Sequence, residues 1–238
     1  RIRIFYKDIF RLPSFNDLYY GETGNNKLKP ENARQYNIGL TYSKDVCPFL
    51  PYLSATVDAY YNKITDKIIA YPTKNLAVWS MRNLGSVEIK GIDVTGNVSL
   101  QPCEKLRINL PGNYTYQRAL DVTNSDPASE EGRTYKHQIA YTPRVSGSGQ
   151  VGIETSWVNL SYSFLFSGKR YAVGQNIAAN RLDSYSDHSI SASRDFRIKK
   201  VTTSLSVEML NIMNKNYEIV KSFPMPGRSV RARFSVRY

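Results

Sequence analysis

Several features that commonly define a protein class are missing from this sequence. No run of 18 apolar residues occurs in the 238 residues, so no transmembrane helix is expected. Two cysteines, Cys47 and Cys103, are too few for a disulfide-dense scaffold and lack metal-site spacing. The two histidines, His137 and His188, lie in separate segments, and no catalytic constellation surrounds them. The sequence therefore predicts no enzyme, and neither a bound metal nor a cofactor.

Charge is present in excess but is not concentrated. Lys and Arg number 32 against 20 Asp and Glu, which gives a net charge of +12. A strongly basic chain commonly indicates nucleic-acid binding. Here the basic residues are scattered through alternating segments and loops, without a recognisable nucleic-acid motif. We expect no nucleic-acid binding, and an anionic solute or lipid is a better match.

The last eleven residues, 228–238, alternate without interruption between two kinds of side chain. One face carries Val230, Ala232, Phe234, Val236 and Tyr238, whereas Arg231, Arg233 and Arg237 lie on the other with two serines. Unpaired charges are costly in a dry core, so the arginine face must meet water or charged partners. A strand that is apolar on one side and cationic on the other is typical of a wall between lipid and a wet lumen.

The same period of two recurs along the chain and predicts about ten strands. The expected strands lie around 35–42, 53–62, 92–100, 106–117, 158–166, 201–209 and 228–238, with weaker ones around 1–7, 138–153 and 184–195. Short connections at 44–51, 101–105 and 196–200 alternate with long ones at 8–32, 63–85, 119–136, 168–183 and 211–227. Short turns at one end and long loops at the other predict an all-β, antiparallel transmembrane barrel with external long loops.

A soluble β-sandwich is the alternative fold, but it requires apolar faces that pack on each other and does not predict the loop asymmetry. Tyrosines and Trp157 near strand ends fit an aromatic girdle at the membrane surface, and equally fit ordinary sheet propensity.

Three segments together resemble TonB-dependent outer-membrane receptors of Gram-negative bacteria. Residues 10–20 and 26–31 are similar to paired boxes of that barrel, and 83–94 is similar to its glycine-containing strand entry, with Asp93 at the acidic position. Residues 208–218, 226–229 and the terminal aromatic strand resemble its C-terminal signature. Their order and spacing match across nearly the whole chain, and the layout is most similar to vitamin B12 and siderophore receptors.

The resemblance implies a larger assembly. Such receptors are 22-stranded barrels with an N-terminal plug. Residues 1–238 would then be the C-terminal ten strands, with the plug domain outside this chain. The implied partners are the TonB complex through the N-terminal part, lipopolysaccharide and membrane lipid, a small-molecule ligand, and the barrel assembly machinery through Tyr238.

The implied function is energy-coupled uptake of a scarce solute such as a siderophore or vitamin B12. Haem receptors of the family that this chain resembles typically carry a histidine between the two boxes, and 11–28 contains none, so the resemblance argues against haem. The alternatives are a passive porin or an adhesive surface barrel without a plug, and a soluble binding domain.

Aromatic and cationic loop residues are the candidates for ligand contact, because aromatics give area at low entropy cost and arginine binds carboxylate or phosphate. These residues are Tyr19, Tyr20, Tyr71, Trp79, Arg82, Arg170, Tyr171 and Arg181. Each could instead belong to the girdle or contact lipopolysaccharide. Within the barrel, Arg231, Arg233 and Arg237 are expected to face the plug or pair with acids on neighbouring strands.

Cys47 and Cys103 fall in short turns separated by one hairpin, in an oxidising compartment. A disulfide between them is one hypothesis, and two unpaired thiols are the other.

Overall fold

The computed structural model describes residues 1–237 except 22, 73–78, 125–130 and 199–200. One antiparallel ten-stranded sheet dominates it, in the order β1-β2-β3-β4-β5-β6-β7-β10-β11-β14. Its strands are β1 (Ile2–Arg11), β2 (Glu31–Lys44), β3 (Tyr52–Pro72), β4 (Trp79–Cys103), β5 (Leu106–Asp121), β6 (Val145–Thr155), β7 (Asn159–Ser167), β10 (Tyr185–Ile198), β11 (Val201–Leu210) and β14 (Ser229–Arg237). The predicted all-β antiparallel fold with about ten strands is confirmed.

Smaller elements occupy the long loops. They are the helix α1 (Phe15–Tyr19), the 3-10 turns η1 (Glu131–Thr134) and η2 (Ala178–Asn180), and two small hairpins. The hairpins are β8 (Arg170–Tyr171) with β9 (Arg181–Leu182), and β12 (Glu218–Val220) with β13 (Phe223–Pro224). Among the described residues, no helix combines the length and apolar character needed to cross a bilayer.

The two faces of the sheet follow the predicted alternation. In β14, Phe234 lies opposite Leu205 of β11, and both side chains are exposed on what we call the outer face. Arg231 lies opposite Glu208 on the other, inner face, where the two side chains form an ion pair. Exposed large apolar side chains continue across the outer face of the other strands, as lipid contact requires.

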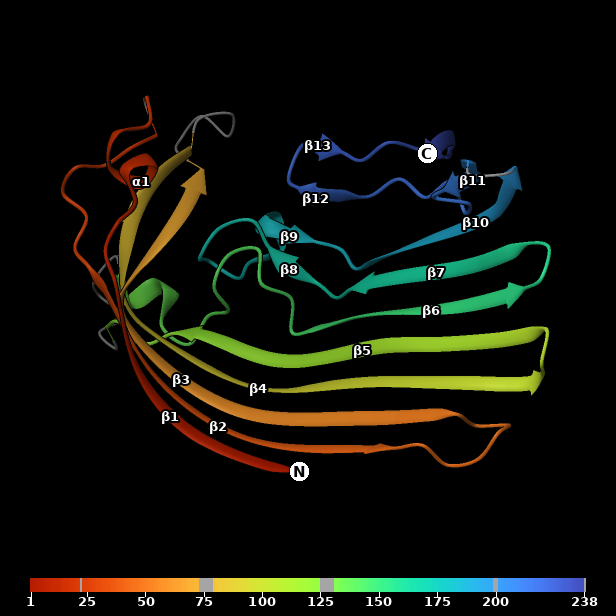
Figure 1. The fold of residues 1–238 in the computed structure, drawn as a ribbon. Helices are drawn as coiled ribbons and strands as arrows, with labels where there is room; N and C mark the ends of the chain where they lie inside the picture. Colours follow the sequence, from red (N-terminus) through yellow and green to blue (C-terminus); the bar gives the residue numbers. More distant parts are fainter. Residues whose placement is uncertain (22, 73–78, 125–130, 199–200, 238) are drawn as a thin grey trace.

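The connections separate by length, and the long loops gather at one end of the strands (Figure 1). The opposite, turn end carries the three predicted short connections and also the β6–β7 turn at 156–158, which the sequence reading missed. The prediction of a long loop at 63–85 was wrong, because β3 continues to Pro72 and β4 begins at Trp79. The two strands of this hairpin stay paired up to Pro72 and Trp79, which is beyond the length that a bilayer needs.

The weaker expected strands are also real, with different limits. The first extends to Arg11 rather than residue 7, and the strand expected from 138 begins at Val145. The segment 137–144 instead runs irregularly beside β5, where Asp121 N–H donates to the His137 carbonyl and Ile139 N–H donates to the Ala119 carbonyl.

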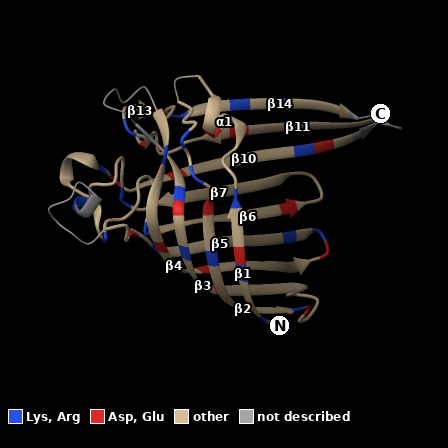
Figure 2. Cartoon of the chain, turned by 90° about the vertical axis from the view of Figure 1, so that its left-hand side faces the viewer, with Lys and Arg blue, Asp and Glu red and all other residues tan. Residues whose placement is uncertain are grey.

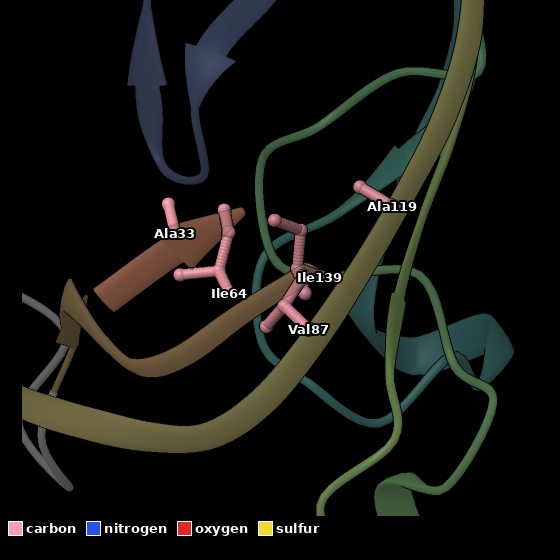
Figure 3. Packing of buried hydrophobic residues seen from close by; sticks show 5 residues of the cluster. All are labelled: Ala33, Ile64, Val87, Ala119 and Ile139. Atoms are coloured by element: carbon pink, nitrogen blue, oxygen red, sulfur yellow. The ribbon is translucent and has the colours of Figure 1, made fainter. Parts of the chain in front are cut away.

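A small apolar cluster fastens this segment to the inner face. Ile64, Val87 and Ile139 meet at its centre, flanked by Ala33 and Ala119 (Figure 3). Val87 and Ala119 are fully buried, whereas most large apolar side chains elsewhere in the sheet are not. The packed core therefore lies near the loop end, where it positions the loops.

Candidate ligand-binding site at the loop end

Asn83 ties the first long loop to the β3–β4 hairpin. Its amide nitrogen donates to the carbonyls of Lys29 (3.0 Å) and Asp66 (2.7 Å), and its amide oxygen accepts the Lys29 N–H at 2.9 Å. One side chain therefore joins three segments. This gives a physical reason for an asparagine at the head of the 83–94 segment.

An ionic cluster fixes the base of the same loop. The Arg11 guanidinium lies 3.1 Å from the Asp17 carboxylate and 3.5 Å from that of Glu31, and both acids are buried. Asp17 also accepts the Ser14 N–H at 2.9 Å, while the Ser14 hydroxyl caps α1. Hydrogen bonds from Ser14, together with Arg11, hold the pKa of the Asp17 carboxyl below its usual value although burial opposes them.

Two asparagines hold the last long loop. The buried Asn211 donates to the carbonyls of Lys215 and Pro226 and accepts the Lys215 N–H. Asn214 accepts the Arg228 N–H at 2.9 Å. Both asparagines have positive φ, a conformation that asparagine tolerates better than most residues.

Arg170, a predicted ligand residue, is buried among loops. Its guanidinium donates to the backbone carbonyls of Asp183, Glu218 and Ile219 and lies 5.0 Å from the Tyr185 ring centroid. Tyr185 stacks on Tyr217 at 4.3 Å. Arg170 therefore has a structural role, because it joins the loop 168–184 to the loop 211–228.

The Tyr217 hydroxyl completes this cluster by donating to the Asp187 carboxylate at 2.5 Å. Burial, followed by this hydrogen bond, raises the pKa of Tyr217 above its ordinary value. The phenol therefore stays neutral and continues to donate.

A polar cavity of about 460 Å³ lies between β4, the end of β5 and the loops that follow β5 and β8. It is lined by Arg82, Asn83, Leu84, Gly85, Asp121, Thr123, Arg133, Thr134, Val173, Gly174 and Gln175. The Asp121 carboxylate accepts hydrogen bonds from the hydroxyls of Thr123 and Thr134, each at 2.6 Å. The exposed Arg82 and Arg133 leave the lining with a net positive charge, which suits an anionic or strongly polar solute.

Gly85 is needed at the wall of this cavity. A Cβ there would lie 2.3 Å from a Thr123 methyl group. The Thr123 hydroxyl meanwhile accepts the Ser86 N–H at 3.0 Å, so the loop contacts the strand closely.

The other predicted ligand residues do not converge on the cavity. Tyr19 and Tyr20 are exposed at the end of α1, and Arg181 is exposed and paired with Asp183 at 3.1 Å. Tyr171 is half-buried in β8. Among the candidates whose side chains the structure describes, only Arg82 lines the cavity, and the side chain of Tyr71 lies outside that part.

The first residue of β4 contacts the segment 137–144. The Trp79 ring lies 5.6 Å from that of Tyr141, which belongs to this segment. Tyr71 lies in β3 opposite Ser80. The hairpin of β3 and β4 and the inner segment are therefore in contact.

Sequence reasoning missed Arg133, Asp121 and Thr134 as cavity residues. They carry no motif, and the fold brings them beside Arg82 only because the chain at 136–144 runs back along β5. Threonine pairs spaced around an acidic residue are the one weak signal available, and they are common in loops.

The inner-face arginines behave in different ways. Arg231 Nε donates to the Glu208 carboxylate at 2.9 Å, which agrees with the expected pairing to a neighbouring strand. Arg233 lies opposite Ser206, and Arg237 lies opposite Thr202 at the end of the described chain. Contact of any of them with a plug stays a prediction, and Tyr238 lies outside the described residues.

A second inner-face ion pair escaped the sequence reading. Arg3 donates two hydrogen bonds of 3.0 Å to Asp58 across β2, where Gly39 leaves room for the Asp58 carboxylate. The alternation within each strand could be predicted from the sequence, but the register between the strands could not.

The two cysteines are exposed and unbonded at the turn end, where Cys47 lies in the β2–β3 connection and Cys103 ends β4 rather than lying in the turn that the sequence predicted. The two segments are in contact, because the Gln101 N–H donates to the Phe49 carbonyl at 2.8 Å. The disulfide between Cys47 and Cys103 stays a hypothesis. Among the described residues, no group of three or more His, Cys, Asp or Glu is arranged to hold a metal ion.

The sheet is apolar on its outer face and polar on its inner face, and it has short turns at one end and anchored loops at the other. This arrangement defines part of an outer-membrane β-barrel. A model of the family described as TonB dependent receptor-like, beta-barrel matches residues 1–212, so the chain belongs to that family. Its members are transporters rather than enzymes, and they lie in the outer membrane of Gram-negative bacteria.

Individual relatives agree with the family. The vitamin B12 transporter BtuB of Photobacterium profundum is 25% identical over 235 residues, which cover 96% of this chain and 34% of the relative. The chain thus spans about a third of that protein's length.

Solved structures support the fold at lower identity. The copper transporter OprC matches with a TM-score of 0.67 and 15% identity, over 96% of this chain and 36% of the transporter. The ferric-catecholate import receptor Fiu from E. coli K12 matches with a TM-score of 0.64 and 17% identity, over 99% of this chain and 32% of the receptor.

Proposed function

We propose that this chain is the C-terminal barrel portion of a receptor that imports a scarce solute across the outer membrane with energy delivered through TonB. The family match over residues 1–212 is the observation that carries the proposal. The solute is of the siderophore or vitamin B12 class, as the similarity to BtuB over 96% of the chain supports.

The proposed ligand site is the cavity between the anchored loops. Arg82 and Arg133 provide two guanidinium groups, while the hydrogen-bonded Asp121 is engaged by Thr123 and Thr134. Cationic groups in a cleft raise the local concentration of an anionic solute and fix its orientation. Binding and gating are the required chemistry, so no catalytic group is needed.

The test uses the full-length receptor in a strain that lacks its own copy. Cyanocobalamin and ferric siderophores of the catecholate and hydroxamate types are supplied, and uptake is measured with and without tonB. TonB-dependent uptake of one solute supports the proposal. Uptake that persists without tonB favours the alternative of a passive porin, and no uptake together with surface adhesion favours an adhesive barrel.

The cavity is tested separately by binding to the purified receptor. Arg82→Ala with Arg133→Ala should weaken binding of the transported solute by about tenfold or more, since each charged hydrogen bond contributes about 1.5–3 kcal/mol. Arg181→Ala is the matched control, because Arg181 is exposed outside the cavity. Equal loss in both variants would rule out the cavity as the site.

A further inference from the structure

Two segments that are far apart in the chain form one side of the cavity. The first segment, 133–144, follows β5 and contributes Arg133 and Thr134 to the lining. The second segment, 168–184, contains β8 and β9 and contributes residues 173–175, which belong to no strand. The shape of the cavity therefore depends on the contacts that join these two segments.

Asn176, the residue that follows 173–175, connects the second segment to the first. Its amide oxygen accepts the Gln138 N–H at 2.6 Å, and its amide nitrogen donates to the Gln138 carbonyl at 2.9 Å. One side chain thus pairs with both backbone groups of a residue that is buried. Because Asn176 adjoins residues 173–175, these hydrogen bonds position that part of the cavity wall.

His137 adds a third hydrogen bond to this junction. Its ring nitrogen Nδ1 accepts the backbone N–H of Asn176 at 3.3 Å. A ring nitrogen that accepts a hydrogen bond carries no proton, so the imidazole in this arrangement is neutral, with its proton on Nε2. We call His137, Gln138 and Asn176 the clasp, because they hold the two segments together.

Another contact between the same two segments does not depend on pH. The Tyr141 N–H donates to the Tyr171 carbonyl at 2.7 Å. Both groups belong to the backbone, so this hydrogen bond does not change with the charge of His137. An opening of the clasp is therefore confined to the residues near 173–176.

Protonation of His137 removes the acceptor from the clasp. Histidine ordinarily changes its charge between pH 5 and 8. In the protonated ring both nitrogens carry a hydrogen, so the Nδ1–H would face the Asn176 N–H, with two donors opposed. A partly buried N–H that loses its acceptor costs free energy. The contact is thus favourable with the neutral ring and unfavourable with the charged ring.

The acidic groups in this region do not stabilise a charged His137. The Asp121 N–H donates to the His137 carbonyl, but the Asp121 carboxylate accepts hydrogen bonds from two threonine hydroxyls, each at 2.6 Å. Glu218 and Arg170 act on Tyr141, at the other contact between the segments. Within the described part of the chain, no carboxylate forms an ion pair with His137.

Basic groups adjoin the clasp and oppose a further positive charge. Lys136 precedes His137, and Arg82 and Arg133 line the cavity. Residues 173–177 of the second segment include no charged side chain. Figure 2 shows basic and acidic residues close together on β2–β5, whereas the sequence on either side of the clasp contributes only Lys136.

We propose that the clasp opens and closes one side of the cavity in response to pH. With His137 neutral the clasp is closed, and residues 173–175 keep their place in the wall. With His137 protonated the clasp opens, and this part of the wall separates from the first segment. The opening follows from the clasp alone, whereas its effect on a bound solute rests on the proposed function of the cavity. A solute bound at neutral pH is then released as the surroundings become acidic.

The second histidine of the chain has a different partner and provides the matched control. The His188 Nδ1 shares a hydrogen bond of 2.7 Å with the Tyr162 hydroxyl, between β10 and β7. A hydroxyl donates or accepts by rotation, so this bond survives protonation of the ring. His188→Asn therefore controls for the loss of a histidine outside the clasp.

The test measures backbone hydrogen exchange of residues 171–177 in the full-length receptor at about pH 7.5 and about pH 5.5, corrected for the intrinsic rate of each amide. The unmodified receptor is compared with His137→Asn, His188→Asn and Asn176→Ala. Asparagine at position 137 offers an acceptor oxygen but gains no proton, so it keeps the clasp closed. Asn176→Ala removes both side-chain bonds to Gln138 and opens the clasp at either pH.

Exchange near residue 176 should be about fivefold faster at the lower pH in the unmodified receptor and in His188→Asn, as the loss of one hydrogen bond predicts. It should be equally slow at both pH values in His137→Asn and equally fast in Asn176→Ala. No acceleration in the unmodified receptor, or the same acceleration in His137→Asn, overturns the proposal.

Binding of cyanocobalamin and of ferric catecholate and hydroxamate chelates is measured on the same four proteins. Weaker binding of one solute at the lower pH, absent in His137→Asn, supports control of the ligand site by the clasp. Faster exchange without any change in binding supports the opening of the clasp and removes the cavity from the proposed function. The pH response and the proposed function therefore fail separately.

Folding is verified by the heat-dependent gel mobility of the barrel. Should His137→Asn fail to fold, His137→Gln, which also offers an acceptor oxygen, takes its place. A pH response of the exchange rate that persists in the glutamine variant overturns the proposal.

Discussion

The wall formed by β1–β5 differs from the wall formed by β6, β7, β10, β11 and β14. In the first wall β3, β4 and β5 have 21, 25 and 16 residues, whereas β6, β7, β11 and β14 have 9 to 11. A transmembrane strand needs about 9–11 residues. Apart from β10, with 14 residues, the second wall is therefore matched to the bilayer, whereas β3, β4 and β5 of the first wall continue well beyond it.

The extra length changes the chemistry of both faces. Above the row formed by Tyr6, Tyr36 and Tyr61, the outer face of the first wall becomes charged, and on its inner face Val87 and Ala119 pack against Ile139. In the second wall, β6, β7, β11 and β14 stay apolar on the outer face to their loop ends, whereas β10 carries the polar Ser186 and His188 there. The loops of the second wall are held by polar anchors such as Arg170 and Asn211. Lipid contact therefore dictates the composition of the outer face only over the span that the bilayer covers.

The largest expected effect comes from a charge within the span of the second wall. Phe234→Arg should destabilise the barrel by about 2–4 kcal/mol, because the outer face there meets hydrocarbon. Thr65→Arg, on the outer face of β3 beyond the tyrosine row, should cost only about 0–1 kcal/mol. Urea unfolding in lipid vesicles measures both, and similar losses would remove the distinction between the walls.

Loss of the Arg170 anchor should be nearly as costly, but local. Arg170→Met removes the buried guanidinium that donates to three carbonyls, which costs about 2–3 kcal/mol. Hydrogen exchange at residues 217–220 should accelerate while the strand amides stay protected. The exposed Arg181→Gln is the control, and protection that is unchanged in Arg170→Met would contradict the anchoring role.

The inner-face ion pairs of the two walls should also differ, by a smaller amount, in the stability that they contribute. Each pair shares two hydrogen bonds, but Arg3 and Asp58 in the first wall are 40% and 22% exposed, whereas Arg231 and Glu208 in the second wall are 56% and 35% exposed. Arg3→Gln should therefore cost about 1–2 kcal/mol and Arg231→Gln at most about 1 kcal/mol. The same urea measurement on the full-length receptor tests this order, and equal losses of stability in the two variants would contradict it.

The smallest effect concerns the pH response of the first loop. The lowered pKa of Asp17 means that its stabilising contribution is present above the unfolded pKa of about 3.9 and is lost as pH falls through the native pKa. Hydrogen exchange of residues 18–25, corrected for intrinsic rate, should rise at acidic pH. Asp17→Asn should flatten that rise although Arg11 and Glu31 remain, and an unchanged acid response would assign it to Glu31.

Much of the barrel could be predicted from the alternation of side chains within each strand. Alternation alone assigned Phe234 and Arg231 to opposite faces, and the register agrees. The ends of β3 and β4 at their shared hairpin could not be predicted in this way, because the residues in this region have the composition of a polar and aromatic loop. Of the predicted ligand residues, Arg82 lines the cavity, whereas Arg170 is enclosed by carbonyls from segments 13 to 49 residues away.

The alternation of side chains, the two faces of the sheet and the separation of short turns from long loops follow from the sequence alone, since a period of two is a local property of each strand. Long-range contacts, in contrast, place 137–144 beside β5, bring Arg133 and Asp121 next to Arg82, and set Arg34, Lys63, Lys90 and Arg118 on neighbouring strands of the outer face. Register and loop packing depend on contacts between residues far apart in the chain, which no local pattern records.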